Sequence, residues 1–426
     1  MIEQAEIDNT PATKQRDPLR VLAVMARRKG DVFVYATGPP LSFLVNRPDH
    51  VRHVLVDGAS RYSKETPMNT AVAEHVARGL LTSEGDAWRR QRHLMQPVFH
   101  RRNTPALAHV VASQFDRMLE RWAPTADGSF HVDAYIEFTR LLFRITSIAL
   151  FHVDPTAWEG NLMPMLHDAL LVLAEEDERD FRVARHILTR VSQEIVNARM
   201  ELGSQRLDDA LGRLIKSGEP EGEFDTLWQH VINMALAGYE TTASVVTWAT
   251  YALAQRPELA AATRARIEHI THGRNLSLHD LRALPELTAI VKETMRLYPP
   301  AWIIGRRALE DDRIGDVDIP RNSVVAISPY TMHRHPQYWD EPEQFDPTRF
   351  LGDAEREREP FTYIPFGAGP RTCIGTNFAL VEAPLIIGEL LQRFSLELVD
   401  PAPVAPRGVF VIVPERPINL RLTPRR

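Results

Sequence analysis

The stretch FGAGPRTCIG holds Cys373, the single cysteine of the 426-residue chain. Its glycines, Gly367, Gly369 and Gly375, permit positive φ angles and close backbone approach. The stretch leads into a strongly apolar, helix-like segment. We therefore expect Cys373 to lie just before a helix N-terminus, where free N–H groups and the helix dipole favour a thiolate. Arg371, two residues earlier, adds positive charge.

Several interpretations of the lone cysteine have to be compared. A free cysteine is usually an inert core residue. A cysteine nucleophile needs a base, which the neighbouring residues do not supply, although a distant histidine could. A zinc site would need three further ligands, and no local cluster provides them. A haem iron needs only one protein thiolate, because the porphyrin gives the four in-plane ligands.

The pattern F-x-x-G-x-R-x-C-x-G is matched in full by Phe366, Gly369, Arg371, Cys373 and Gly375. It resembles the haem-thiolate loop of the cytochromes P450. The resemblance implies that Cys373 is the proximal ligand of haem b (iron protoporphyrin IX). It also implies that Phe366 shields the sulfur and that Arg371 pairs with a haem propionate.

Two other segments fit the same family. In KETMR, Glu293 and Arg296 are three residues apart on an apparent helix, so they share a face. Alone, this spacing is common and typical of a surface ion pair. EPEQFDPTRF, with Arg349, has the P-x-x-F-x-P-x-R-F form. By resemblance these three residues form a structural network that locks the loop behind the haem.

The run LAGYETTASVV lies within the longest apolar helical segment. Glycine and threonine weaken a helix there, so an ordinary kink is one interpretation. The run also matches the family's oxygen-binding groove at Ala237, Gly238, Glu240, Thr241 and Thr242. The resemblance implies that Gly238 leaves room for dioxygen. Glu240 and Thr241 would relay protons to the distal oxygen.

Trp88 and Arg92, in DAWRRQRHLM, are four residues apart on one helical face. The family uses such a W-x-x-x-R pair to bind haem propionates. By its spacing, Arg306 is expected to do the same, and the adjacent Arg307 leaves that choice open.

Further arginines form a local basic patch: Arg89, Arg90, Arg101 and Arg102. A solvated helix face is the plainer interpretation of each one. The sharper interpretation is a docking surface for an acidic electron carrier.

The elements that must position these residues are mostly helical. Helical apolar spacing is found at 104–124, 132–153, 158–177, 181–202 and 225–254. Strand-like runs lie at 32–38, 42–46 and 324–330 and in the tail at 394–422. We predict a mainly α fold with a small β region built from both chain ends, as in the cytochrome P450 fold. The prediction is one domain over 1–426, flexible over about 1–19, with no fused reductase.

Composition excludes several classes. The net charge of −6, without aromatic interleaving of the basic residues, argues against nucleic-acid binding. One cysteine allows no internal disulfide, and no apolar run forms a signal peptide or membrane anchor. We expect a cytoplasmic monomer.

The resemblance implies a monooxygenase that uses dioxygen and electrons from a separate ferredoxin-like carrier with an NAD(P)H-dependent reductase. The expected substrate is a hydrophobic small molecule, with candidate pocket walls at 66–82, 160–185, Ala237, 303–304 and 409–410. Hydroxylation, epoxidation and oxidative coupling, for instance in natural-product biosynthesis, all remain open. Two alternatives remain: a peroxide-driven peroxygenase or rearrangement enzyme of the same fold, and a non-catalytic haem sensor or carrier.

Overall fold

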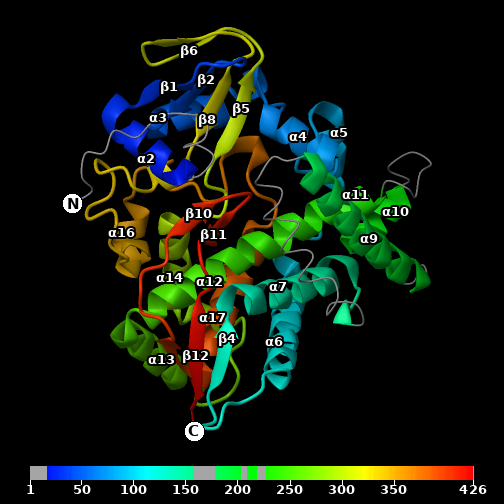
Figure 1. Cartoon of the computed structure of the whole chain (residues 1–426), viewed down its shortest axis with the longest axis vertical. Coiled ribbons are helices and arrows are strands. Elements are labelled where there is room, and N and C mark those ends of the chain that lie inside the picture. The colour runs from blue at the N-terminus through cyan, green and yellow to red at the C-terminus, as the bar shows by residue number, and fades with distance from the viewer. Residues whose placement is uncertain (1–16, 157–177, 203–208, 218–226, 426) are drawn as a thin grey trace.

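The structure is a computed structural model that describes residues 17–156, 178–202, 209–217 and 227–425 (Figure 1). The longer helices are α2 (Pro18–Lys29), α4 (Pro67–His75), α5 (Gly85–Met95), α6 (Thr104–Glu120), α7 (Ala134–Phe151), α9 (Glu178–Glu201), α10 (Ala210–Ser217), α11 (Leu227–Ala235), α12 (Thr241–Ala254), α13 (Pro257–Thr271), α14 (Pro285–Leu297) and α17 (Thr376–Arg393). Shorter helical turns are α3 (Pro48–Arg52), η1 (His53–Asp57), η2 (Ala59–Arg61), η3 (Arg101–Asn103), η5 (Leu236–Glu240), η6 (Asp280–Arg282), α15 (Pro329–Met332), η7 (Pro347–Phe350), α16 (Gly352–Arg356) and η8 (Gly369–Arg371). The strands are β1 (Val32–Ala36), β2 (Ser42–Val45), β3 (Tyr62–Ser63), β4 (Phe130–Asp133), β5 (Ile304–Ala308), β6 (Asp312–Ile314), β7 (Val317–Ile319), β8 (Val324–Ile327), β9 (Phe394–Leu398), β10 (Pro406–Gly408), β11 (Ile412–Pro414) and β12 (Asn419–Pro424).

The helical core is formed by α6, α7, α12, α14 and α17, which pack against one another. α12 crosses the middle of the molecule, with α17 and α7 beside it (Figure 1). Most of α12 is buried, and Trp248 on it has no exposed surface. Burial of these apolar faces supplies the main stabilisation of the core. The prediction of a mainly helical middle is confirmed, while its segment at 158–177 lies outside the described residues.

The long helix predicted at 225–254 is present as α11, η5 and α12, with η5 forming one π turn. Gly238 in this turn lies against α7, and a Cβ there would be 2.9 Å from Cγ2 of Thr146. The hydroxyls of Thr241 and Thr242 donate to the carbonyls of Ala237 and Gly238, at 2.8 and 3.2 Å. Such back-bonding competes with the regular ladder, which explains why the helix widens here.

The largest sheet has the strand order β1-β2-β8-β5-β3 and lies at the top of Figure 1. β2 and β8 run parallel, with Phe43 opposite Val325, so the sheet joins residues near 45 to residues near 325. This confirms that segments distant in sequence share a sheet. β5, which carries the predicted Arg306, pairs antiparallel with β8.

The C-terminal strands differ from the prediction in one respect. β12 pairs with β9 and with β4, and Leu420 lies opposite both Leu398 and Val132. The tail therefore pairs with a strand from the helical middle of the chain and not with the N-terminal strands. The four residues of β4 are too few to show a period-two pattern, which is why this strand could not be predicted from the sequence.

Candidate functional site

The cysteine loop is shaped by two glycines with positive φ. Gly367 and Gly369 both have φ of 69°. A Cβ on Gly369 would lie 1.9 Å from the carbonyl oxygen of Leu55, so no other residue fits at this position. Gly375 differs from the expectation: its φ is −83°, and it is the residue that precedes α17. A Cβ there would lie 3.8 Å from the Cys373 sulfur.

Cys373 is held three residues before Thr376, the first residue of this helix. Its N–H donates to the carbonyl of Phe366 at 2.9 Å, which closes the loop. Burial raises the pKa of the Cys373 thiol, while the N–H groups of Gly375 and Thr376 and the charge of Arg92 pull the pKa down. The loop therefore aims N–H donors and a cation at the sulfur, an arrangement that supports a thiolate once an electrophile or metal is bound.

The thiol opens onto a cavity of about 410 Å³. Sequence-predicted residues on its wall are Trp88, Arg92, Ala237, Gly238, Thr241, Arg306, Phe366, Arg371, Cys373 and Gly375. Five other predicted residues do not line it: Glu240, Gly369, Glu293, Arg296 and Arg349. Segments almost 300 residues apart in the chain, such as those of Trp88 and Gly375, thus line the same cavity.

Cationic side chains gather on one part of the wall. The Arg371 guanidinium lies 3.7 Å from the ring centroid of Trp88 and is ion-paired with Glu84. Arg92 donates from Nη1 to the carbonyl of Thr372 at 2.9 Å, so it is tied to the cysteine loop.

Arg306 and Arg307 are neighbours on β5, where successive side chains point to opposite faces of the strand. Arg306 lines the cavity. Arg307 lines a separate surface groove and donates from Nη2 to Asn322 Oδ1 at 2.8 Å. Lys64, which the sequence analysis did not select, also lines the cavity.

The positive charges of Lys64, Arg92, Arg306 and Arg371 are suited to an anionic ligand. Burial, followed by the charge of Arg371, lowers the pKa of Lys64 to about 7 and that of Arg306 to about 10. Such shifts show cations that lack sufficient counter-charge. A ligand that carries two carboxylates and is bound beside the thiol would supply this counter-charge. The residues present therefore fit haem.

Ala237 of the π turn η5 and Thr241, the first residue of α12, also line the cavity. Glu240 is 2% exposed and turned away from the cavity. Its Oε1 accepts a hydrogen bond from the Tyr135 hydroxyl, and its Oε2 has no partner among the described residues. Burial raises the pKa of Glu240 to about 7, although the Tyr135 hydrogen bond acts in the opposite direction.

Glu382 is a buried acid that the sequence analysis missed. It lies on α17, lines the cavity and is hydrogen-bonded to the side chain of Thr242. The Thr242 hydroxyl donates to the Gly238 carbonyl, so a protonated Glu382 can donate to Thr242. Burial raises the pKa of Glu382 to about 8, which keeps the carboxyl protonated at neutral pH. The sequence does contain a signal for Glu382, because it is the single acidic residue within the apolar run NFALVEAPLIIG.

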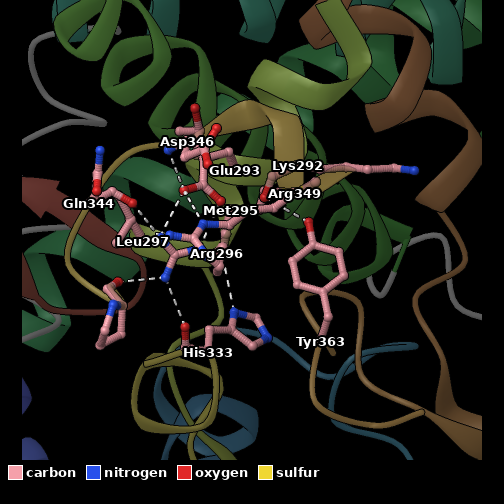
Figure 2. Close-up of polar contacts among 12 residues, drawn as sticks. Lys292, Glu293, Met295, Arg296, Leu297, His333, Gln344, Asp346, Arg349 and Tyr363 are labelled. Carbon is pink, nitrogen blue, oxygen red and sulfur yellow. Dashed lines mark hydrogen bonds and ion pairs between the residues drawn. The ribbon is translucent and has the colours of Figure 1, made fainter. Parts of the chain in front are cut away.

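Behind the cysteine loop, Glu293 and Arg296 form a fully buried bidentate pair, with Nε–Oε2 at 2.7 Å and Nη2–Oε1 at 2.8 Å (Figure 2). Arg296 also donates to the carbonyls of His333, Pro342 and Gln344, at 2.6 to 3.0 Å. All five of its N–H groups are therefore used.

Arg349 approaches the same acid, with its Nε 3.7 Å from Glu293 Oε1 (Figure 2). The N–H of Asp346 donates to that oxygen at 2.8 Å. The segment around η7 is thereby attached to α14, as the motif predicts.

His333 connects this network to the cysteine loop. Its Nε2 accepts the N–H of Ile364 at 2.8 Å, so the proton lies on Nδ1, which faces the Met295 carbonyl at 3.3 Å. Burial, followed by the charge of Arg296, lowers the pKa of His333 to about 3, so the ring is neutral. Ile364 lies two residues before Phe366, and the network therefore holds the start of the loop.

The pocket walls are partly as predicted. Leu80, Leu81, Ile303 and Ile304 line the cavity. The residues at 409–410 do not line it and pack instead against Tyr135. The part of the predicted wall at 160–177 lies outside the described residues.

The predicted basic patch lies on α5 and η3. Arg89 is ion-paired with Asp86 at 2.5 Å, and Arg101 donates to Asn377 Oδ1 at 3.3 Å. Arg101, Arg102 and Arg89 are exposed. Asn377 belongs to α17, so part of the patch lies beside the cysteine side of the cavity.

A cysteine thiol that shares a cation-lined cavity with a π turn and the threonine directly after that turn is the site of a haem-thiolate protein. The family model for cytochrome P450 matches residues 9–154 and 156–422. The chain belongs to the cytochrome P450 family and is an oxidoreductase of the monooxygenase type. The family implies a haem-thiolate iron cofactor.

Curated relatives agree with this assignment. Cyclooctatin synthase of Streptomyces melanosporofaciens is 28% identical, over 92% of this chain and 88% of its own length. Pentalenene oxygenase of Streptomyces avermitilis is 27% identical, over 96% and 94%. The Arabidopsis thaliana protein LUTEIN DEFICIENT 5, chloroplastic, is 28% identical, over 88% and 68%. In the described part of the chain, no helix has the length and apolar character needed to cross a membrane.

Proposed function

We propose that this cytochrome P450 uses dioxygen and electrons from a separate ferredoxin-type carrier to oxidise an apolar, isoprenoid-like small molecule. One observation carries the proposal: Cys373 and Thr241 line a single cavity whose wall also holds the cationic side chains of Lys64, Arg92, Arg306 and Arg371. The names of the two Streptomyces relatives support the substrate class.

Haem b would be held by Cys373 at the iron and by Arg92, Arg306 and Arg371 at the propionates, with Trp88 packed beside Arg371. When bound, the haem supplies the binding and reductive cleavage of dioxygen. Phe366 lines the cavity together with Cys373, and Gly238 lines it where its backbone packs closely against Thr146 of α7.

The chain's own contribution to proton supply comes from Glu240 and Thr241. Burial raises the pKa of Glu240 to about 7, so its carboxyl exchanges a proton readily near neutral pH. The carboxyl is bound to Tyr135 and must swing away from it to serve the cavity. Thr241 bonds back to Ala237 at 2.8 Å and can pass a proton by turning its hydroxyl inward.

The cavity wall supports an apolar substrate. Leu80, Leu81, Ile303, Ile304 and Val245 are among the apolar residues that line it. An apolar wall binds its ligand by burying apolar surface, and a few polar groups fix the orientation of that ligand. The exposed arginines near α17 would attract an acidic carrier, and this attraction weakens at high salt.

A second candidate, peroxide-driven oxidation, is favoured by one observation: Glu240 is bound to Tyr135 and does not line the cavity. The test supplies the haem-loaded chain with spinach-type ferredoxin, its reductase and NADPH, and separately with hydrogen peroxide, using a panel of cyclic terpenes. We expect oxygenated product with the electron chain. Product with peroxide alone would establish the second candidate instead.

A further inference from the structure

The loop 77–81 contributes to the wall of the cavity and is attached to α11 mainly by the amide side chain of Asn233. Leu80 and Leu81 from this loop line the cavity, and so does Asn233. Asn233 is buried, with 5% of its surface exposed. A polar side chain at such a position needs partners, and all of its partners are backbone groups.

The hydrogen bonds of Asn233 are complete. Its Oδ1 accepts the N–H of Leu81 at 3.2 Å. Its Nδ2 donates to the carbonyl of Ala77 at 3.1 Å and to that of Gln229, one turn earlier on α11, at 3.3 Å. One amide therefore grips both ends of the loop, with its acceptor on one end and a donor on the other.

The loop itself is shaped to receive this side chain. A Cβ on Gly79 would lie 2.7 Å from Cγ of Asn233, so the residue between the two gripped ends has to be a glycine. The neighbouring Arg78 N–H donates to the Gln229 side chain at 2.9 Å, which adds a second contact with α11. On its other side, Lys64 donates to the carbonyls of Leu80 and Leu81, at 3.2 and 2.6 Å.

We propose that Asn233 is a positioning residue that latches the loop 77–81 over the cavity and thereby controls how long a substrate is retained. The inference rests on the proposed function, because it assigns a regulating element to the same cavity. Covering loops with few apolar contacts open more readily than the core, and a side-chain latch is what keeps such a loop closed. The latch is separate from the proton path, since the Asn233 side chain is hydrogen-bonded to Leu81, Ala77 and Gln229, none of which belongs to that path.

Three variants test the latch. Asn233→Asp has the same size but replaces both donor hydrogens with an acceptor that faces two carbonyl oxygens. Gly79→Ala disturbs the same contact from the loop and removes no atom of the cavity wall. Val245→Ala is the control, because it enlarges the cavity from α12 without touching the loop.

The readouts are amide hydrogen exchange at Leu81 and the rate at which 4-phenylimidazole leaves the haem-loaded protein. We expect Asn233→Asp and Gly79→Ala each to speed exchange at Leu81 by about tenfold, as the loss of a buried hydrogen bond predicts. Release of 4-phenylimidazole should quicken in both. Val245→Ala should leave the exchange rate unchanged.

Unchanged exchange at Leu81 in the two latch variants, or an equal rise in Val245→Ala, would overturn the inference. If one latch variant does not fold, the other decides, because each acts on the same contact from a different side. A chain that binds no haem would refute the proposed function. The exchange comparison would still decide the latch.

Discussion

On the cysteine side of the cavity, Arg296 uses all five of its N–H groups, whereas on the π-turn side Glu240 keeps one buried oxygen without a partner among the described residues. Both groups are ionisable and fully enclosed. Arg296 is fixed by five hydrogen bonds of 2.6 to 3.0 Å, whereas the Glu240 carboxyl is bound by a single hydroxyl, that of Tyr135.

The difference shows a division of tasks. A ligand to iron has to stay in one position, and a network with every donor satisfied gives that rigidity. A proton-handling group has to change partners, and an incompletely satisfied carboxyl retains that freedom.

The largest expected effect concerns the buried pair. Arg296→Met removes one partner and leaves the Glu293 carboxylate buried, which should lower the free energy of unfolding by about 3–5 kcal/mol. Arg266→Met is the matched control, because Arg266 forms a largely exposed pair with Glu286 at 3.3 Å. The control should cost less than about 1 kcal/mol. Urea unfolding of the haem-loaded proteins measures both, and equal costs would contradict the rigid-network account.

The second prediction concerns Glu382. Burial raises the pKa of this carboxyl to about 8, so the folded state holds a proton that the unfolded state has already released. Stability should therefore be fully present at acidic pH and fall as pH rises towards 8, by on the order of 3 kcal/mol. In Glu382→Gln, the midpoint of unfolding should depend less on pH over this range. The exposed control Glu415→Gln should leave the slope as it is in the wild type, and a slope that survives in Glu382→Gln would exclude this carboxyl as its source.

The third prediction concerns Thr241. Thr241→Val keeps the shape of the side chain but removes the hydroxyl that faces the cavity wall and bonds to Ala237. Product formed per NADPH consumed should fall by about tenfold, with hydrogen peroxide released instead. Thr250→Val is the control, because this buried threonine makes the same kind of back-bond, to Val246 at 2.7 Å, away from the cavity. Full coupling in Thr241→Val would remove this residue from the proton path.

The smallest effect is expected for Tyr135→Phe. Loss of the hydroxyl frees the Glu240 carboxyl and removes the hydrogen bond that lowers its pKa. The alkaline limb of the pH profile of turnover should move to higher pH, and the rate at pH 7 should change by no more than about threefold. A shift to lower pH would show that the tyrosine does not stabilise the ionised carboxyl.

Part of this molecule could be predicted from sequence because its chemistry is local. Cys373, Gly369 and Arg371 lie within five residues, and Glu293 and Arg296 lie on one helical turn. Their partners are largely backbone groups that any chain with this fold would present. The mainly helical middle followed from apolar periodicity in the same way.

Other parts depended on contacts that no local pattern contains. Tyr135 meets Glu240 across 105 positions, and Asn233 meets Leu81 across 152. β4 pairs with the C-terminal tail, although its four residues are too short to show a period. The orientation of Glu240, away from the cavity, is set by that distant tyrosine, and so the motif alone could not predict it.

The central claim is that Cys373 is the thiolate ligand of a haem held by this cavity. The most direct measurement is the absorption spectrum of the reduced carbon monoxide complex of the wild-type chain and of Cys373→His, each loaded with haem. We predict the red-shifted Soret band of a thiolate-ligated haem in the wild type and its loss in Cys373→His. A wild-type band at the position given by histidine ligation, or a thiolate-type band that persists in Cys373→His, would contradict the account.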